Sequence, residues 1–152
     1  NIGIFYNEQD IFDGTIYDNI CMGNDSISPS EIMKLAEMLE IKDFISQLPE
    51  GIYTPLQPTG KGLSTIIAKK ILLLRAIANR PELLVLDEPF ELAGAESSKK
   101  ISKYLTDLQN TTCMVVSGYI PFAKRADLII WLEKGRIKHI GHPETILPLV
   151  IN

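Results

Sequence analysis

The sequence predicts an α/β fold built on a mainly parallel sheet with flanking helices and a small helical subdomain. Residues 83–86 read Leu-Leu-Val-Leu, a run too short for a helix and apolar enough for a strand buried on both faces. A helical pattern precedes this strand over residues 65–79, and a second apolar, β-branched run follows at 112–116. Strands that alternate with helices are typical of parallel sheets, because a parallel connection needs a crossover.

Before the central strand, the chain is predicted to form one short strand and a group of helices. The clearest start signal is Ser28, which can cap a helix that has Pro29 at its first position and Glu31 completing a capping box. The expected elements are a strand at residues 2–6 and helices at residues 15–20, 28–39 and 42–47.

The long helix at residues 65–79 has Ser64 as its expected N-cap, and Pro81 closes the segment. Its apolar residues recur at helical spacing on one face, namely Ile67, Ile71, Leu74 and Ala78. Beyond the central strand we expect helices at 96–109, 121–125 and 143–150, and strands at 112–116, 128–132 and 136–140.

Composition narrows the possible functions. The 152 residues can hold one ordinary core, and the net charge is −4 with scattered lysines and arginines, which argues against nucleic acid as a partner. Cys21 and Cys113 lack metal-ligand spacing, so we expect buried free thiols, with a disulfide as the alternative. No apolar run approaches the roughly 20 residues that cross a bilayer.

The central strand ends in two carboxylates, Asp87 and Glu88, followed by Pro89. Ligands of open α/β sheets bind at the carboxyl ends of the strands. In phosphate chemistry the first acid can hold Mg²⁺, and the second can orient or deprotonate an attacking water. The alternative is a core strand that ends in a solvated acidic turn.

The order of these motifs resembles the ABC-type ATPase family. A Gly-rich turn with Leu63 and Ser64 opens a long helix, and the next strand ends in Leu-Asp-Glu-Pro at residues 86–89. In that family an LSGGQ motif opens the helix that precedes the Walker B strand. An unrelated α/β fold that carries this tetrapeptide by chance is the alternative.

The resemblance covers nearly the whole chain and points to exporter-type members. Residues 11–16 with 18–20 are similar to the segment after the Q-loop of exporters, and residues 126–137 with 141–144 are similar to the closing strands and last helix. The family implies a P-loop NTPase-like fold. It also implies a single partial nucleotide-binding domain over residues 1–152, with a helical subdomain at about 15–80 and a core sheet at 1–6 and 81–152.

The phosphate-binding loop of such a fold, GxxxxGK[ST], is missing from this sequence. The Gly60-Lys61 pair does not match it, because Pro55 stands where the first glycine is needed and Gly62 where Ser or Thr is needed. The chain also starts at Asn1 rather than Met. We therefore expect it to be the second half of a nucleotide-binding domain, cut from a longer protein.

By resemblance, the candidate site residues are a metal ligand, a general base and two nucleotide-binding groups. Asp87 would bind Mg²⁺ and Glu88 would be the catalytic base. Asn7 falls where the family has its Q-loop glutamine, with Gln9 as the alternative after a two-residue slip. Ser64 is the serine that survives from the signature motif at the γ-phosphate.

Several site positions depart from the family. The signature motif reads Leu-Ser-Thr-Ile-Ile at residues 63–67, where β-branched Thr65 and Ile66 crowd the approach of a phosphate, so we favour an ordinary capped helix. Gly94 replaces the aspartate of the turn after the Walker B strand, and Gly118 replaces the switch histidine. The two histidines in the sequence, His139 and His142, are expected on the surface.

The resemblance implies the cytoplasmic, energy-coupling domain of an exporter, which uses Mg-ATP when intact. Its partners would be a membrane-spanning transporter domain, which holds it at the inner face of the membrane, and a second nucleotide-binding domain in a homo- or heterodimer. Because of the departures, we expect no nucleotide binding and no hydrolysis by this chain alone. The alternative is a pseudo-ATPase that acts as a structural or regulatory module.

Overall fold

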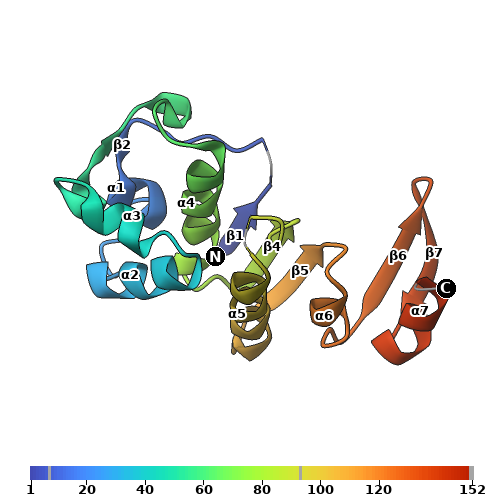
Figure 1. Cartoon of the computed structure of the whole chain (residues 1–152). Coiled ribbons are helices and arrows are strands. Elements are labelled where there is room, and N and C mark those ends of the chain that lie inside the picture. The colour runs from blue at the N-terminus through green and yellow to red at the C-terminus, as the bar shows by residue number, and fades with distance from the viewer. Residues whose placement is uncertain (7, 93, 151–152) are drawn as a thin grey trace.

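Three parallel strands form the central sheet of the molecule. The computed structural model describes residues 1–6, 8–92 and 94–150. Strand β4 (Leu83–Asp87) lies between β1 (Ile2–Phe5) and β5 (Thr112–Val116), and both neighbours run parallel to it (Figure 1). The predicted central position of residues 83–86, beside the strand at 112–116, is confirmed.

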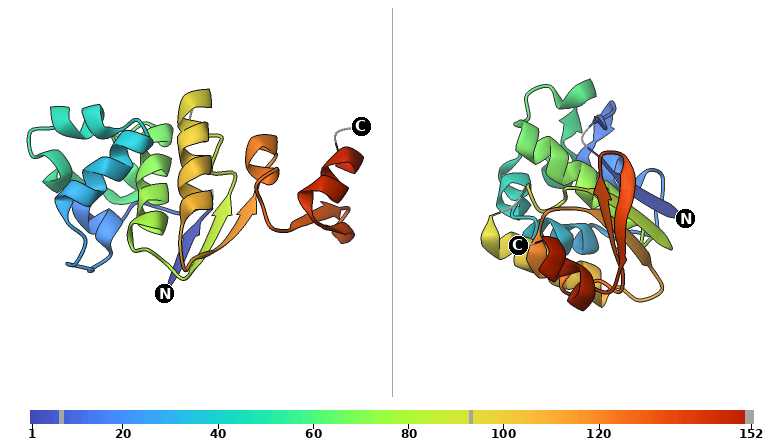
Figure 2. Two further views of the ribbon diagram at one scale, coloured as in Figure 1. Left: turned by 90° about the horizontal axis from the view of Figure 1, so that it is seen from below. Right: turned by 90° about the vertical axis from the view of Figure 1, so that its right-hand side faces the viewer.

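Two helices cover one face of this sheet, α4 (Thr65–Ala78) and α5 (Ala95–Asp107) (Figure 2). Leu84 and Leu86 point into that layer and are fully buried. Ser64 caps α4, since its hydroxyl accepts a hydrogen bond from the Ile67 N–H at 3.2 Å. The predicted capped helix before the central strand is thus confirmed.

The opposite face of the sheet is uncovered among the described residues. Alternate residues of the three strands point to it, and four large apolar ones among them are exposed: Ile2 (61%), Ile4 (45%), Met114 (59%) and Val116 (57%). The expectation that residues 83–86 are buried on both faces is wrong, because Leu83 and Val85 of β4 are only half-buried. The described helices α4 and α5 form a single layer on one face of the sheet, and no described helix covers the face to which Leu83 and Val85 point.

The helical group packs beside the sheet and is joined to it by α4. It consists of α1 (Ile16–Cys21), α2 (Pro29–Met38) and α3 (Lys42–Gln47), and α4 contacts both α1 and α2. The predicted capping box is present, because Ser28 accepts from the Glu31 N–H while the Glu31 carboxylate accepts from the Ser28 N–H. Buried isoleucines of α1, α2 and α3 supply the core of this group.

Four short elements near α1 and α4 were not predicted. Strand β2 (Gly14–Thr15) pairs antiparallel with β3 (Pro55–Leu56), and the 3-10 turns η1 (Gly51–Tyr53) and η2 (Pro58–Gly60) flank β3. A two-residue strand carries no periodic pattern, so it is invisible in the sequence.

The C-terminal part forms a separate hairpin and helix. After α6 (Ile120–Ala123), strands β6 (Ile129–Glu133) and β7 (Arg136–Gly141) pair antiparallel, and α7 (Pro143–Val150) packs on them (Figure 1). Among the described strands, neither β6 nor β7 bonds to β5.

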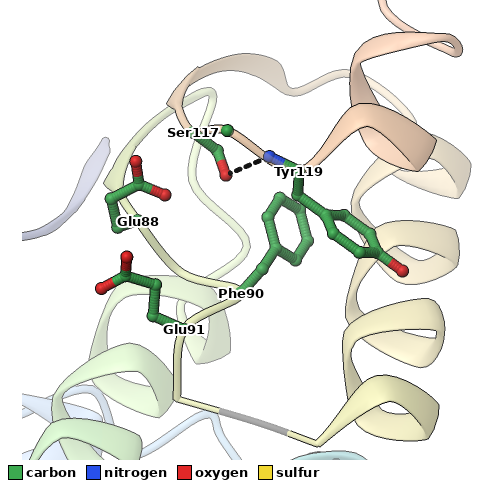
Figure 3. A pocket seen from close by; sticks show the side chains of 6 residues that line it. Glu88, Phe90, Glu91, Ser117 and Tyr119 are labelled. Atoms are coloured by element: carbon green, nitrogen blue, oxygen red, sulfur yellow. Dashed lines mark hydrogen bonds between the residues drawn. The ribbon is translucent and has the colours of Figure 1, made fainter.

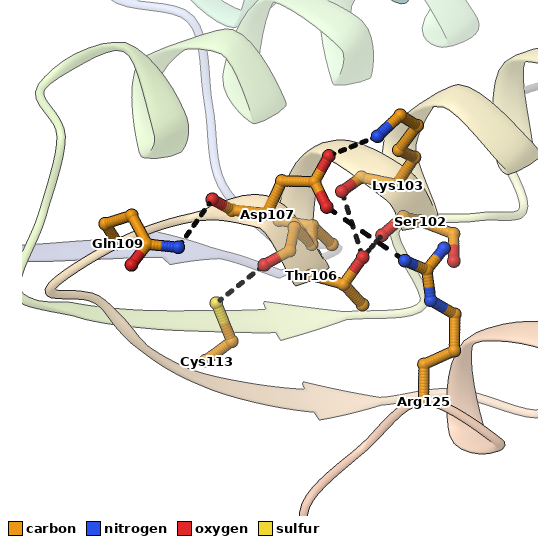
Figure 4. A network of polar contacts seen from close by, with 8 residues as sticks. Ser102, Lys103, Thr106, Asp107, Gln109, Cys113 and Arg125 are labelled. Atoms are coloured by element: carbon orange, nitrogen blue, oxygen red, sulfur yellow. Dashed lines mark hydrogen bonds and ion pairs between the residues drawn. The ribbon is translucent and has the colours of Figure 1, made fainter.

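Polar contacts tie the C-terminal end of α5 to its neighbours (Figure 4). Asp107 pairs with Lys103 one turn earlier and lies 4.0 Å from Arg125, which follows α6. The hydrogen bond from Lys103 lowers the pKa of the Asp107 carboxyl. On the other side, the Cys113 thiol of β5 donates to the Leu105 carbonyl at 3.9 Å. Cys21 and Cys113 are both free thiols, as expected, but only Cys21 is buried and Cys113 is half-buried.

Within the described part of the chain, no helix has the length and apolar character to cross a membrane.

Candidate functional site

The carboxyl end of β4 is where the predicted acids lie. Asp87 is the last residue of β4 and is half-buried. Glu88 follows it with φ = 47°, a left-handed conformation that L side chains rarely adopt. Its N–H still donates to the Val116 carbonyl at 2.9 Å, so the hydrogen bonds between β4 and β5 continue to Glu88 before the chain turns away.

A hollow of about 260 Å³ opens beside Glu88 (Figure 3). Its lining combines two carboxylates with aromatic and small residues: Glu88, Phe90, Glu91, Ser117, Gly118 and Tyr119. The Phe90 ring lies 4.7 Å from the Tyr119 ring and 5.2 Å from the Phe122 ring, centroid to centroid. The hollow therefore has an aromatic wall and an acidic wall.

The charge of this hollow suits a cation. Two carboxylates line it, and none of its lining residues is lysine, arginine or histidine. Magnesium in nucleotide sites takes one or two carboxylates, with waters and phosphate oxygens as the other ligands. Among the described residues no group of three or more His, Cys, Asp or Glu could hold a metal. Asp87, which does not line the hollow, would thus hold Mg²⁺ only together with a nucleotide or water.

Gly118 marks the predicted place of the switch histidine, and it borders the hollow. A Cβ atom built on Gly118 would have no other atom within 4 Å, so the position has room for a side chain. His139 lies on β7 and His142 just before α7, and both are exposed, as expected. Neither histidine lines the hollow.

Ser64 lies at the N-terminal end of α4. Since α4 runs antiparallel to β1 and β4, this end faces the same side of the molecule as the carboxyl ends of the strands (Figure 1). Ser64 does not line the hollow, and its hydroxyl is engaged as the helix cap. Ile66 is 57% exposed at the same end, where it presents a bulky apolar side chain.

Of the two candidates for the Q-loop amide, Asn7 and Gln9, the structure describes only Gln9. Asn7 lies outside the described residues. Gln9 folds back on the end of β1, because its amide nitrogen donates to the Ile4 carbonyl at 3.0 Å and its amide oxygen accepts from the Tyr6 N–H at 3.3 Å. The Gln9 amide is thus occupied by the backbone of its own turn.

The sequence analysis missed one polar cluster, formed by Asn19 and Arg75. Asn19 is fully buried on α1, and the Arg75 guanidinium donates to its side-chain and backbone oxygens at 2.7 Å each. Burial lowers the pKa of Arg75 below its ordinary value. The available signal was an asparagine between the isoleucines of a short helix, since buried polar groups need partners.

Known proteins with related sequences match almost the whole length of this chain. It is 32% identical over 148 residues to the uncharacterized ABC transporter ATP-binding protein YknU of Bacillus subtilis, covering 97% of this chain and 25% of that protein. It is 34% identical over 143 residues to the ATP-dependent lipid A-core flippase of Saccharophagus degradans, covering 93% and 24%. The chain is a homologue of ABC transporter ATP-binding proteins.

Further comparisons define the extent of this relationship. The cyclolysin secretion/processing ATP-binding protein CyaB of Bordetella pertussis is 31% identical over 147 residues, covering 96% of this chain and 21% of that protein. A bacterial Atm1-family ABC exporter with ATP bound superposes with a TM-score of 0.81 at 24% identity, over 97% of this chain and 26% of that one, and thus shares the fold. No protein-family model matches the sequence.

The resemblance to exporter-type ABC ATPases is therefore confirmed. The chain spans about a quarter of the length of the relatives that it matches, so it corresponds to a fragment of an ABC exporter.

Proposed function

We propose that this ABC exporter fragment is a degenerate nucleotide-binding domain that does not hydrolyse ATP on its own. The observation that carries the proposal is the hollow beside Glu88, which has two carboxylates and no cationic or imidazole side chain in its lining. A phosphoryl group in transfer needs positive charge or hydrogen-bond donors around its oxygens. Here the two acids of the lining, Glu88 and Glu91, have no such partner within it.

Each candidate residue keeps the role that the family resemblance gives it. In the intact domain, Asp87 would be the ligand for Mg²⁺ and Glu88 the general base, while Ser64 and Asn7 would contact the nucleotide. Mg-ATP is the cofactor of the intact domain. Support comes from the place of Asp87 and Glu88 at the carboxyl end of a central parallel strand, where such sheets bind ligands.

The expected partners are a membrane-spanning transporter domain and a second nucleotide-binding domain, with this chain at the cytoplasmic face of the membrane. Two relatives are named for the secretion of cyclolysin and for flipping the lipid A-core, which supports a place in export.

Calorimetric titration of the chain with Mg-ATP tests the proposal. We expect no binding tighter than about millimolar, a scale of roughly 4 kcal/mol. Titration of the Glu88→Gln variant serves as the matched control, since it removes one charge from the hollow without changing its size. A micromolar dissociation constant for the unmodified chain would contradict the proposal.

A second candidate is a pseudo-ATPase that serves as a structural or regulatory module. The observation in its favour is Gly118, which leaves open space where a switch histidine would be. Such a module would bind its partner domain equally well with and without Mg-ATP. A partner affinity that rises with nucleotide would exclude it.

A further inference from the structure

Asn19 joins α1 to the chain segment that follows β1. Its side-chain oxygen accepts from the Phe12 N–H at 3.0 Å, and its side-chain nitrogen donates to the carbonyls of Phe12 and Thr15, also at 3.0 Å. The side chain is fully buried and out of reach of water, so it depends on these hydrogen bonds to satisfy its polar atoms. Asn19 thus fixes the backbone at Phe12.

Arg75, in the last turn of α4, holds the same segment from the other side. Its guanidinium donates to the Asp10 carbonyl at 3.1 Å and to both oxygens of Asn19 at 2.7 Å, and it lies 5.2 Å from the centre of the Phe12 ring. These contacts use the fixed fork of the guanidinium, which a lysine ammonium does not reproduce. Residues 10–12 are thereby bound to the C-terminal end of α4.

The same segment also touches the turn that leads into α4. The Thr59 N–H donates to the Ile11 carbonyl at 2.9 Å. A Cβ atom built on Gly60 would lie 3.4 Å from Ile11, so the turn packs directly on that side chain. This turn, η2, is followed four residues later by Ser64, the cap of α4. Residues 10–12 therefore contact α4 at its last turn and the chain just before its first.

We propose that Arg75 is a positioning residue that makes residues 10–12 a rigid crosspiece between the exit of β1 and the N-terminal end of α4. A displacement of the chain after β1 would then move η2 and Ser64 with it, because the same three residues are bonded to both. The functional meaning of this coupling rests on the proposed function, in which Ser64 would contact the nucleotide in the intact domain.

Amide hydrogen exchange, followed residue by residue by NMR on this chain without nucleotide, tests the crosspiece. The variant Arg75→Met keeps the aliphatic stem and removes the guanidinium. We expect the exchange rates of the Phe12 and Thr59 amides to rise about tenfold or more, as for the loss of a hydrogen bond to a charged group. Thr59 has no hydrogen bond to Arg75, so its response reports transmission through Ile11.

Arg80→Met is the matched control, because the exposed Arg80 follows the same helix and pairs with Glu31 instead. It should leave both amides unchanged. If Arg75→Met does not fold, Arg75→Lys carries the test, with a rise of at least about threefold at both amides since it keeps the charge but not the fork.

Two results would overturn the proposal. Faster exchange at Phe12 with no change at Thr59 would show that Arg75 holds only its own contacts. An equal rise at Leu84 and Leu86 of β4 would show general destabilisation instead of positioning. Neither result bears on the titration with Mg-ATP, so failure of the crosspiece and failure of the proposed function are separable.

Discussion

Gly3 of β1 lies directly against the backbone of Ala76 on α4. A Cβ atom built on Gly3 would be 2.1 Å from the Ala76 carbonyl oxygen and 2.9 Å from a side-chain carbon of Pro81. No real Cβ contact is this short, so only glycine allows the strand and the helix to approach in this way. The contact places the C-terminal end of α4 at the start of the sheet.

The substitution Gly3→Ala should therefore lower the free energy of unfolding by about 1–3 kcal/mol, the usual cost of overpacking a close contact. The backbone oxygen of Ala76 cannot rotate away, so α4 or β1 has to shift. Urea denaturation measures the change. Gly118→Ala is the control, because a Cβ there meets no atom within 4 Å; equal losses in the two variants would contradict the prediction.

A second prediction concerns the start of α5, where Gly94 is the N-cap. Its backbone is extended (φ −64°, ψ 169°) and no side chain caps the helix. Gly94→Asp would supply an acceptor for the free N–H groups of the first turn, and there is open space for it. We expect Gly94→Asp to exceed Gly94→Ala in unfolding free energy by about 1 kcal/mol. Equal stability of the two variants would count against this cap.

The capping box of α1 predicts a dependence of stability on pH. Hydrogen bonds from the Thr15 side chain and backbone lower the pKa of the Asp18 carboxyl. A lowered pKa in the folded state contributes stability above the unfolded value of about 4, and this contribution is lost as the pH falls through the folded value.

The variant Asp18→Asn isolates this contribution. The difference in urea midpoint between the unmodified chain and Asp18→Asn should favour the unmodified chain at pH 6 and shrink toward pH 2. A difference that stays constant over that range would show that Asp18 titrates alike in the folded and unfolded states.

A fourth prediction concerns catalysis. Gly118→His places a side chain beside the hollow at a position where a Cβ atom meets no other atom within 4 Å, so the variant should fold normally. It should still release phosphate from Mg-ATP far more slowly than the 1 s⁻¹ of working enzymes. The side chains of Thr65 and Ile66 still crowd the N-terminal end of α4, and each lost transition-state contact costs on the order of 10²–10³-fold in rate.

Phosphate release by Gly118→His is compared with that of the double variant Glu88→Gln with Gly118→His. Equal, background rates in the two are expected. A rate of 1 s⁻¹ or more that disappears in the double variant would show that one histidine restores the site.

Local signals in the sequence predicted most of the elements. The capping box at Ser28 and Glu31, the cap at Ser64 and the apolar run of β4 each depend on neighbouring residues, and all three are present. The family resemblance was likewise visible in the order of short motifs and is confirmed by the relatives. Asp87 and Glu88 lie where the sequence analysis placed them, at the end of the central strand.

Features that depend on distant residues were not predictable. The half-exposed face of β4 depends on how many layers pack on the sheet, and an apolar run reads the same with one layer or two. The pairing of β2 with β3 joins residues about 40 apart in the sequence, and each of the two strands is only two residues long. The Arg75–Asn19 cluster spans 56 residues, and nothing in the local pattern of α4 distinguishes Arg75 from a surface arginine.

The uncovered face of the sheet determines how the isolated chain behaves in the test tube. The exposed side chains of Ile2 and Ile4 on β1 and of Met114 and Val116 on β5, with β4 between them, form one apolar surface. Monomeric proteins rarely leave large surfaces of this kind in water, and sulfate strengthens their association while cooling weakens it. The isolated chain should accordingly bind hydrophobic dyes in its folded state, salt out early, and remain monomeric best when dilute and cold.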